Sequence, residues 1–301
     1  MDLYHLWLFH NVSQNLSFTK TAEALHISQP TISMQVKKLE DEVGLKLFER
    51  YGRNIYLTQY GEILYSYSQK IFNLVEEMKA EIHSIKGEMF GKLNIGASNT
   101  PGIYILPDIM GTFKEKYPNV KTNLHIGNTY EIQSMMVLNQ VDIAVIGGEL
   151  DLPKSFYAEK LIDDLMVLVV SPSHPLANYD YIDRRLLANQ MYIAHESNSN
   201  LYNAIEKIVK KNLKLPFNTA MTLGSIDAIK HAVAANLGIS IVPLTSVKQD
   251  IQLGMLKRIS VEGRVWTYPY NLVYYKDRNL TIPTKVMIQT IKEKIGRIVS
   301  D

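Results

Sequence analysis

Residues 18–50 constrain the fold more than any other stretch, because they have the pattern of two short helices joined by a tight turn. Apolar residues recur at helical spacing within residues 18–25. The second part starts sharply, since Ser28 is a good N-cap residue and Pro30 suits a first turn, where a missing N–H costs little. Gly44 then supplies a helix stop. The sequence therefore predicts a helix-turn-helix unit near the N-terminus.

The two sides of the second helix differ in character. Ile32, Val36 and Leu39 form one apolar stripe at spacings of four and three. The opposite side carries hydrogen-bonding side chains and two lysines: Gln29, Thr31, Ser33, Lys37 and Lys38. A short helix with one buried stripe and such a polar side fits the major groove of DNA. An ordinary helical hairpin with a solvated side is the alternative that this pattern alone leaves open.

Two further elements complete a small head of residues 1–58. An amphipathic helix over residues 2–15 adds a third helix around the core. Residues 50–58 have the pattern of a β-hairpin wing, with Gly52 in the turn. Arg53 at the tip would reach a phosphate or the minor groove, unless it is only an exposed turn residue.

Residues 59–91 are predicted to form a long linker helix that ends in a hinge at Gly87 and Gly91. Apolar residues recur along this helix at steps of four and three, as in a heptad seam: Ile63, Tyr67, Ile71, Leu74, Met78, Ile82 and Ile85. The stripe must be buried, and a second copy of the chain is the economical partner, because a dimer also supplies two heads for two DNA half-sites. Packing of the stripe on the chain's own next domain is the alternative.

The amino-acid sequence of residues 21–50 resembles the DNA-binding domain of the LysR-type transcriptional regulators over its whole length. It reads TAEALHISQPTISMQVKKLEDEVGLKLFER. The matching residues are Ala22, Ala24, Leu25, Ser28, Gln29, Pro30, Ser33, Leu39, Glu40, Gly44, Leu47, Phe48 and Arg50. The resemblance implies a winged helix-turn-helix. We expect its DNA contacts at Ser28, Gln29, Pro30, Thr31, Ser33, Met34, Lys37, Lys38, Arg50 and Arg53. An arginine is common in the family where this chain has Met34, so one contact departs from the family pattern.

Residues 92–301 have a different sequence pattern, in which short apolar, β-branched runs alternate with helical patterns. The runs are LNIGAS, NLHIG, VDIAVIGGE, LMVLVVSP, QMYIAH, ISIVP and YNLVYY. This layout predicts an α/β domain with a mostly parallel sheet. Several runs end in small polar residues that open the next helix. Such ends converge on a cleft whose free backbone N–H groups favour a small anion.

The effector-binding domain of the same family is similar to this region. It looks like a periplasmic binding protein, with two α/β lobes between which the chain crosses twice. By that pattern lobe I spans residues 92–161 and 268–301, and lobe II spans residues 162–267. LGSIDAIKHAVAANLGISIVP, residues 223–243, matches the family's second-lobe signature. Many members carry Gly-Ser-Gly-Thr-Arg where residues 198–202 read NSNLY, so the usual anion contact is missing there.

Candidate effector contacts are the polar residues at these strand ends and helix starts: Ser98, Asn99, Thr100, Thr129, Gly148, His195, Ser197, Ser199 and Ser225. Ser98 and Thr100 come first, because hydroxyls and backbone amides meet at a helix start, although each also fits a plain N-cap role. The alternative for Gly148 is a simple turn. The alternative for His195 is a polar residue at a strand end. No arginine occurs in these loops, so neutral donors and helix dipoles would hold a small carboxylate or oxyanion.

Composition excludes several function classes. Lys and Arg number 32 against 30 Asp and Glu, a net charge of +2, so the DNA argument rests on placement rather than on net charge. The absence of cysteine excludes disulfides, thiol catalysis and cysteine metal sites. The histidines are scattered, and no nucleophile elbow, phosphate-binding loop or His-Glu-x-x-His motif occurs. We expect no catalytic residues, no metal and no cofactor. Without a signal peptide or membrane-spanning run, we expect a soluble cytoplasmic protein.

The combined prediction is an α+β multidomain chain: a winged helix-turn-helix, a long linker helix and a two-lobed α/β effector domain. A ligand-responsive, sequence-specific transcription regulator fits these features best. A transport-type binding protein would use the cleft but not the head, and an α/β enzyme would need a catalytic constellation. The family resemblance further implies double-stranded DNA sites that are interrupted palindromes with a T-N11-A core, and a homodimer or homotetramer. It also implies action as activator or repressor, with RNA polymerase as a further partner.

Overall fold

The computed structural model describes residues 1–52, 54–85, 89–197, 199–276 and 280–300. The chain divides into two compact units. One is Met1–Ile85 with Leu138–Gln140, and the other is Lys86–Val137 with Val141–Asp301. In the described part of the chain, no helix combines the length and the hydropathy that crossing a bilayer requires.

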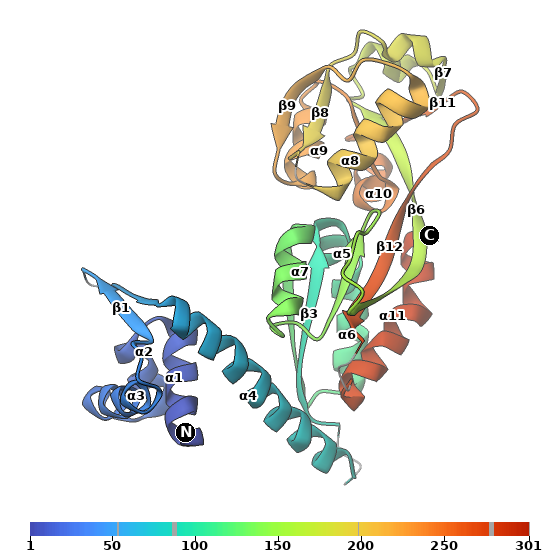
Figure 1. Cartoon of the computed structure of the whole chain (residues 1–301). Coiled ribbons are helices and arrows are strands. Elements are labelled where there is room, and N and C mark those ends of the chain that lie inside the picture. Colours follow the sequence, from blue (N-terminus) through green and yellow to red (C-terminus); the bar gives the residue numbers. More distant parts are fainter. Residues whose placement is uncertain (53, 86–88, 198, 277–279, 301) are drawn as a thin grey trace. The chain divides into compact units, whose positions relative to one another are not determined.

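The first unit begins with three helices whose apolar sides meet in one core, shown in blue in Figure 1. The side-chain oxygens of Asp2, Ser17 and Ser28 each accept a hydrogen bond from a first-turn backbone N–H and so start the helices. The three helices are α1 (Leu3–Asn15), α2 (Phe18–Leu25) and α3 (Gln29–Val43). The buried core residues are Leu6, Leu8, Phe9, Val12, Ala22, Ile32, Val36, Leu39, Leu47 and Ile55.

A two-stranded hairpin and one long helix complete this unit. Strands β1 (Phe48–Tyr51) and β2 (Asn54–Leu57) pair antiparallel, as the wing prediction required. The long helix α4 spans Gln59–Ile85, and the Gly61 N–H donates to Thr58 Oγ1 at 3.0 Å in its first turn. Gly61 is required there, because a Cβ would lie 2.1 Å from the Leu47 carbonyl oxygen.

Helix α4 has two apolar sides with different surroundings. Leu64, Tyr65 and Phe72 pack against the core of the head. Most of the predicted heptad seam stays exposed within this unit: Ile63, Tyr67, Leu74, Met78 and Ile82. Ile71, in contrast, packs on the head core. The side chain of Ile85 and the hinge residue Gly87 lie outside the described residues.

The second unit contains two α/β lobes. In lobe I three parallel strands lie in the order β4, β3, β5, with helices packed against them. Strand β3 ends at the residue before helix α5, which places backbone N–H groups and polar side chains at the strand's carboxyl end. The elements are β3 (Gly91–Ser98), α5 (Asn99–Tyr104), α6 (Leu106–Lys116), β4 (Val120–Gly127), α7 (Thr129–Val137), β5 (Ile143–Gly147) and α11 (Ile282–Ser300).

Lobe II is built from shorter elements, among which β8 and β9 pair parallel. One of its helical segments, η3, is a π-helix that directly continues α8. The elements are η1 (Pro175–Asn178), β7 (Tyr181–Ile182), η2 (Arg184–Leu187), β8 (Tyr192–His195), α8 (Asn200–Glu206), η3 (Lys207–Leu213), β9 (Thr219–Leu223), α9 (Ile226–Ala234), β10 (Ser240–Pro243), α10 (Leu244–Gln252) and β11 (Lys257–Val261).

Two long strands, β6 (Phe156–Val170) and β12 (Trp266–Tyr275), cross between the lobes side by side and antiparallel (Figure 1). β12 pairs with β5 in lobe I, and β6 pairs with β10 and β11 in lobe II. The eight-stranded sheet therefore runs through both lobes.

The prediction of a mostly parallel sheet is wrong. Among the described strands, parallel ladders join β3 with its two neighbours, β8 with β9, and β11 with β7, and one isolated parallel bridge joins Tyr192 and Ile239. Every ladder made by β6 or β12 is antiparallel. Apolar runs that are buried on both sides look the same in either type of sheet, so the runs at residues 165–172 and 270–275 did not reveal their direction.

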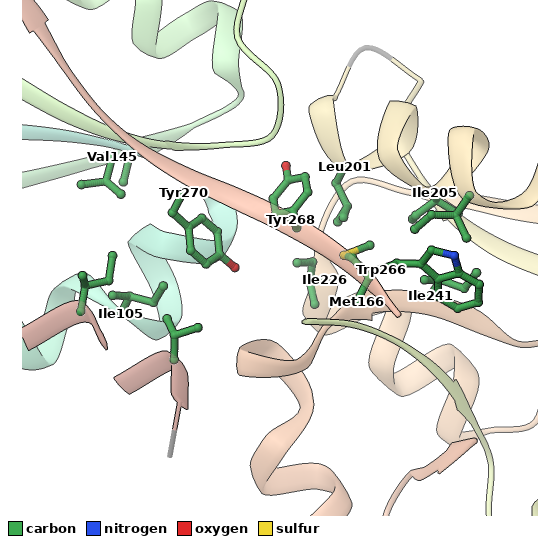
Figure 2. Packing of buried hydrophobic residues seen from close by; sticks show 14 of the residues in the cluster. Ile105, Val145, Met166, Leu201, Ile205, Ile226, Ile241, Trp266, Tyr268 and Tyr270 are labelled. Carbon is green, nitrogen blue, oxygen red and sulfur yellow. The ribbon is translucent and has the colours of Figure 1, made fainter. Parts of the chain in front are cut away.

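Side chains of the crossover strands join the cores of the lobes. Trp266, Tyr268 and Tyr270 of β12 are buried in the same apolar cluster as Ile105 of lobe I and Ile241 of lobe II (Figure 2). The hinge between the lobes is thus packed like a protein interior, which favours a few discrete arrangements of the lobes over continuous bending.

Candidate DNA-binding helix and ligand cleft

Helix α3 presents one side to solvent because its other side is fixed in the head. Ile32, Val36 and Leu39 are buried, and they anchor the helix along its length. Ser28 Oγ accepts a hydrogen bond from the Thr31 N–H at 3.3 Å. Its hydroxyl also lies 2.7 Å from Thr31 Oγ1. The start of the helix is therefore ordered before any partner binds.

The sequence-predicted DNA contacts lie on that outer side or beside it. Met34 is half exposed, and both Lys37 and Lys38 are exposed. Gln29 Nε2 donates to Ser33 Oγ at 2.8 Å, so these two side chains are held together but keep further hydrogen-bonding capacity. The remaining members Ser28, Pro30, Thr31 and Arg50 are exposed or partly exposed. Arg53 lies outside the described residues.

A residue that sequence reasoning left without a role, Glu40, fixes the wing to α3. Its carboxylate accepts the Leu47 N–H at 2.9 Å and the Phe48 N–H at 3.4 Å. Lys46 Nζ donates to the second carboxylate oxygen at 2.7 Å. Glu40 thereby ties the end of the candidate recognition helix to the start of β1. Its place in the matching family signature was the one signal that could have identified it.

Polar residues from both lobes line a small cleft of about 30 Å³. Six of the predicted effector contacts lie there together: Ser98, Asn99, Thr100, Thr129, His195 and Ser199. The cleft also contains residues that sequence reasoning did not select: Gly127, Asn128, Asn200, Leu201, Ile226 and Tyr268. Gly148 lines a neighbouring cavity instead, and Ser197 and Ser225 line neither of the two.

The serines and threonines at the helix starts differ in what their hydroxyls do. Ser98 makes no cap hydrogen bond, and its Oγ accepts the Gly147 N–H at 2.9 Å. Ser199 caps α8, since its Oγ accepts the Tyr202 N–H at 3.1 Å and its hydroxyl donates to the Glu196 carbonyl at 2.9 Å. The plain capping interpretation therefore fits Ser199, whereas the Ser98 hydroxyl hydrogen is left for a ligand.

Ser225 caps α9 by accepting the Ala228 N–H at 3.2 Å. The buried hydroxyl of Thr100 faces the hydroxyl of Tyr270 on β12 and acts to lower the pKa of that phenol, against the larger effect of burial. Thr100 thus connects the wall of the cleft to the hinge, a role that its position in the sequence did not indicate.

His195 is the most sharply defined polar group of the cleft. Its side chain is 2% exposed, and Nδ1 is buried without a hydrogen-bond partner among the described residues. Burial lowers the pKa of the imidazole, and the neighbouring Glu196 opposes that effect only in part. His195 is therefore neutral at ordinary pH and can donate or accept one hydrogen bond into the cleft. A buried polar atom without a partner normally indicates a missing water or ligand.

The described residues that line the cleft include no lysine, arginine, aspartate or glutamate. A ligand there would be held by hydroxyls, amides, the imidazole and backbone N–H groups at helix starts. Such a set binds a small anion without neutralising it by a full charge. In the described parts of the chain, no three His, Cys, Asp or Glu residues are close enough together to hold a metal ion.

Beside the cleft, a clamp joins the lobes. Asn200, the first residue of α8, donates through Nδ2 to the Gly147 carbonyl at 2.9 Å and to the Glu149 carbonyl at 3.3 Å. Lys207 forms an ion pair with the Glu149 carboxylate. On another α-helix of each lobe, the Tyr104 hydroxyl donates to Asp227 at 2.7 Å. The lobes are therefore in direct contact.

Comparisons with known proteins match both units. A family model described as "Bacterial regulatory helix-turn-helix protein, lysR family" matches residues 3–62, and one described as "LysR substrate binding domain" matches residues 86–296. A "Probable RuBisCO transcriptional regulator" from Cyanidium caldarium is 34% identical over 250 residues, which cover 82% of this chain and 79% of the relative.

Two solved structures have the same fold. A full-length OxyR variant from Pseudomonas aeruginosa has a TM-score of 0.76 at 22% identity, covering 98% of this chain and 94% of that one. The regulatory domain of Synechocystis PCC6803 CcmR in complex with 2-PG has a TM-score of 0.61 at 21% identity, covering 67% of this chain and 96% of that one.

Proposed function

The chain belongs to the LysR family of DNA-binding transcription regulators, and we propose that it reads a two-fold DNA site through α3 and responds to a small anion held in its cleft. The observation that carries the first part is the outer side of α3, a helix fixed in the head by its buried stripe and tied to the wing by Glu40. In such a docking, residues near the helix start touch base edges, and exposed lysines touch phosphates.

We assign the contacts by chemistry. Gln29, Thr31 and Ser33 supply donors and acceptors for base edges or nearby phosphates, and Pro30 supplies an apolar surface for a thymine methyl or a sugar. Lys37 and Lys38 contact phosphates of the DNA backbone, whatever the base sequence. Met34 gives apolar contact where a family arginine would give a charged one, which lowers the electrostatic share of the affinity.

The oligomer that places two heads on one site is a homodimer formed along α4. The exposed seam from Ile63 to Ile82 supports it, because an apolar stripe of that length on a monomer would stay in water. Two such dimers together would form the homotetramer. The matching DNA site is an interrupted palindrome, since two-fold protein symmetry requires two-fold half-sites.

The ligand of the cleft is a small carboxylate or phosphate-like oxyanion. The hydroxyl, amide and imidazole groups in the uncharged lining support this class, together with the buried Nδ1 of His195, which has no partner among the described residues. The complex of CcmR with 2-PG makes 2-PG the first ligand to test, and the RuBisCO regulators among the relatives make operons of that kind the first targets to test. Regulation by a metabolite in the cytoplasm, as activator or repressor with RNA polymerase as partner, follows from this assignment.

Coupling between the cleft and DNA requires the ligand to bind one arrangement of the lobes better than another. Typical coupling free energies of about 1–3 kcal/mol change the affinity for DNA by roughly 5–150-fold. The clamp of Asn200 and Lys207 on the β5–β6 loop is the contact that distinguishes such arrangements. No catalytic step is involved.

In the deciding experiment, the purified full chain selects the fragments of the source genome that it binds. The most enriched fragment is then footprinted with and without 2-PG. A protected, roughly two-fold site beside an operon is expected, with a ligand-dependent change in the protected region. Enrichment of no sequence, with salt-sensitive binding to all DNA, would contradict sequence-specific reading. A ligand response unchanged by Ser98→Ala and Thr100→Ala would contradict the cleft assignment.

A further inference from the structure

A second and larger cavity, of about 500 Å³, lies beside the cleft and takes its walls from both lobes. It shares only Asn200 and Tyr268 with the cleft. Lobe I contributes the Gly148–Glu149 turn, lobe II contributes α8 and η3, and the crossover strand β12 passes along one side. Its volume falls within the range of about 300–1,000 Å³ that is usual for small-molecule sites. The 30 Å³ cleft, in contrast, is too small for a ring in this arrangement.

One wall of this cavity is apolar and aromatic. Trp266 and Tyr268 of β12 both line it, together with Val265 and Pro269 of the same segment. Ile208 faces it from η3. Trp266 is 8% exposed, and Figure 2 shows its ring among buried side chains of lobe II, so the indole is held in place. A fixed indole favours a planar ring that stacks on it.

The rim that η3 forms is positively charged. Lys207, Lys210 and Lys211 line it together with two carboxylates, Glu149 and Glu206. Lys207 pairs with Glu149, and Lys210 pairs with Glu206. Lys211 has no ion pair with a described residue. The net charge of these five groups is therefore +1, and it is concentrated on η3.

Helical spacing brings the lysines of η3 to the same rim, because residues three and four apart lie on one side of a helix. π-helical segments are rare and occur frequently at functional sites. This segment follows α8 directly, and Asn200 at the start of α8 forms the clamp.

The cavity exists because the lobes approach each other closely at Gly148. Its φ of +93° is one that glycine tolerates, and a Cβ there would lie 2.6 Å from Asn200 Cβ. A ligand that touches both η3 and the Gly148–Glu149 turn would bind only while the lobes are in contact. It would therefore stabilise the clamped arrangement.

We propose that this cavity is a second ligand site, for an organic anion with a planar apolar ring. The ring contacts the side that Trp266 and Tyr268 line, and the anionic group pairs with Lys211 while the Lys207–Glu149 ion pair of the clamp stays in place. The ligand is distinct from the small anion of the cleft, and the two act in the same direction because both require contact between the lobes.

The chain offers a direct readout, because it has two tryptophans, Trp7 in the head and Trp266 in this cavity. In a Trp7→Phe full-length protein, Trp266 is the sole tryptophan. Its fluorescence is titrated with phenyl phosphate and phenylacetate. Inorganic phosphate and acetate serve as ring-free controls, and benzyl alcohol serves as a charge-free control.

We expect a saturable change with the two aromatic anions and none with the three controls at the same concentration. Lys211→Ala should weaken binding by roughly tenfold or more, which is the loss of one charge-assisted contact. Raising the salt concentration should weaken binding to the parent more than to this variant. Lys121→Ala, which removes an exposed lysine of β4 outside the cavity, should bind like the parent.

Binding that survives Lys211→Ala and Lys207→Ala but is lost in Ser98→Ala would place the aromatic anion in the cleft and overturn the second site. The absence of any saturable change with either aromatic anion up to roughly 10 mM, about 2–3 kcal/mol of binding, would also overturn it. Neither result touches the cleft assignment, which is tested with 2-PG and the Ser98 and Thr100 variants.

Discussion

Asp164 has no exposed surface and lies at the centre of the hinge, on β6. The Tyr270 hydroxyl donates to it at 2.8 Å, and the Thr245 N–H at the start of α10 approaches both carboxylate oxygens at 3.4 Å. Burial raises the pKa of this carboxyl, although its hydrogen bonds act in the opposite direction. This one carboxylate therefore links both crossover strands and a lobe II helix, and Tyr270 lies beside Thr100 of the cleft wall.

The raised pKa gives a pH dependence of stability with a definite sign. Between the usual carboxyl pKa and the raised one, the native state binds the proton and the unfolded chain does not. The free energy of unfolding therefore falls as pH rises through that window. Asp164→Asn should flatten this fall. Urea unfolding followed by Trp266 fluorescence in the Trp7→Phe chain measures it, and an unchanged pH dependence would show that Asp164 titrates normally.

Tyr270→Phe removes the donor and leaves the buried carboxylate short of one hydrogen bond. We expect the free energy of unfolding to drop by about 1–3 kcal/mol at neutral pH. The drop should be smaller at low pH, where Asp164 is protonated in the native state. The same fluorescence assay compares the two pH values. An equal drop at both would mean that lost packing, rather than the carboxylate, dominates the effect.

At the scale of elements, the proposed reading of DNA assigns different tasks to α3 and α4. The buried stripe and the Glu40 brace fix the outer side of α3 relative to the wing, and in the proposal the exposed seam of α4 is the surface for a second copy. A preordered helix loses less conformational entropy on binding, so more of its contact energy appears as affinity. The contribution of each element can be tested separately.

Changing Lys37 or Lys38 to alanine should weaken binding to specific and unrelated DNA alike. Each phosphate contact removed should lower the slope of log affinity against log salt by about 0.9. Fluorescence anisotropy over a salt series measures the slope, with Lys121→Ala as a control outside the head. A slope equal to that of the parent would remove the lysine from the phosphate contacts.

Leu74→Glu should break the proposed α4 dimer, because it places a charge in the seam. Losing burial of one such side chain in each copy removes about 2 kcal/mol per protomer, which is roughly a thousandfold in the association constant. Sedimentation equilibrium at micromolar concentration distinguishes monomer from dimer. Glu76→Ala, two residues away and outside the seam, should leave the mass unchanged. A dimeric Leu74→Glu protein would place the interface elsewhere.

At the scale of the whole effector unit, the proposed response to a ligand rests on the contacts between the lobes. The clamp uses Asn200, Gly148 and Glu149, and the hinge uses Asp164 and Tyr270, so both sides of the crossover strands carry polar contacts between distant segments. A ligand of a few atoms can shift the balance of such contacts, because a packed hinge has discrete arrangements rather than a continuum.

Gly148→Ala tests the clamp with a matched control. The added Cβ would lie 2.6 Å from Asn200, so the lobes must separate, and we expect affinity for the cleft ligand to fall by about tenfold, an ordinary coupling. Gly254→Ala also has a positive φ, +70°, but meets no atom within 4 Å, so it reports backbone strain alone. Calorimetric titration with 2-PG measures both. Equal losses in the two variants would refute the clamp.

The sequence by itself determined the features that depend on near neighbours. Ser28, Pro30 and Gly44 fix the start and stop of α3, because capping involves residues within a few positions. The spacing of the seam from Ile63 onwards predicted one continuous apolar side of α4, since helical period is a local property, and five of its residues are exposed within the first unit. The small polar ends of the strands were recognised in the same way, and six of those residues line one cleft.

The tertiary structure decided what depends on segments far apart in the chain. The direction of β6 and β12 is set by the crossing between lobes, so their apolar runs were mistaken for parallel strands. The brace of Glu40, the buried Nδ1 of His195 that has no partner among the described residues, and the hinge carboxylate Asp164 acquire their chemistry from burial, which no single segment encodes. The larger cavity arises only where a π-helix of lobe II meets a turn of lobe I, because its walls are brought together by folding alone.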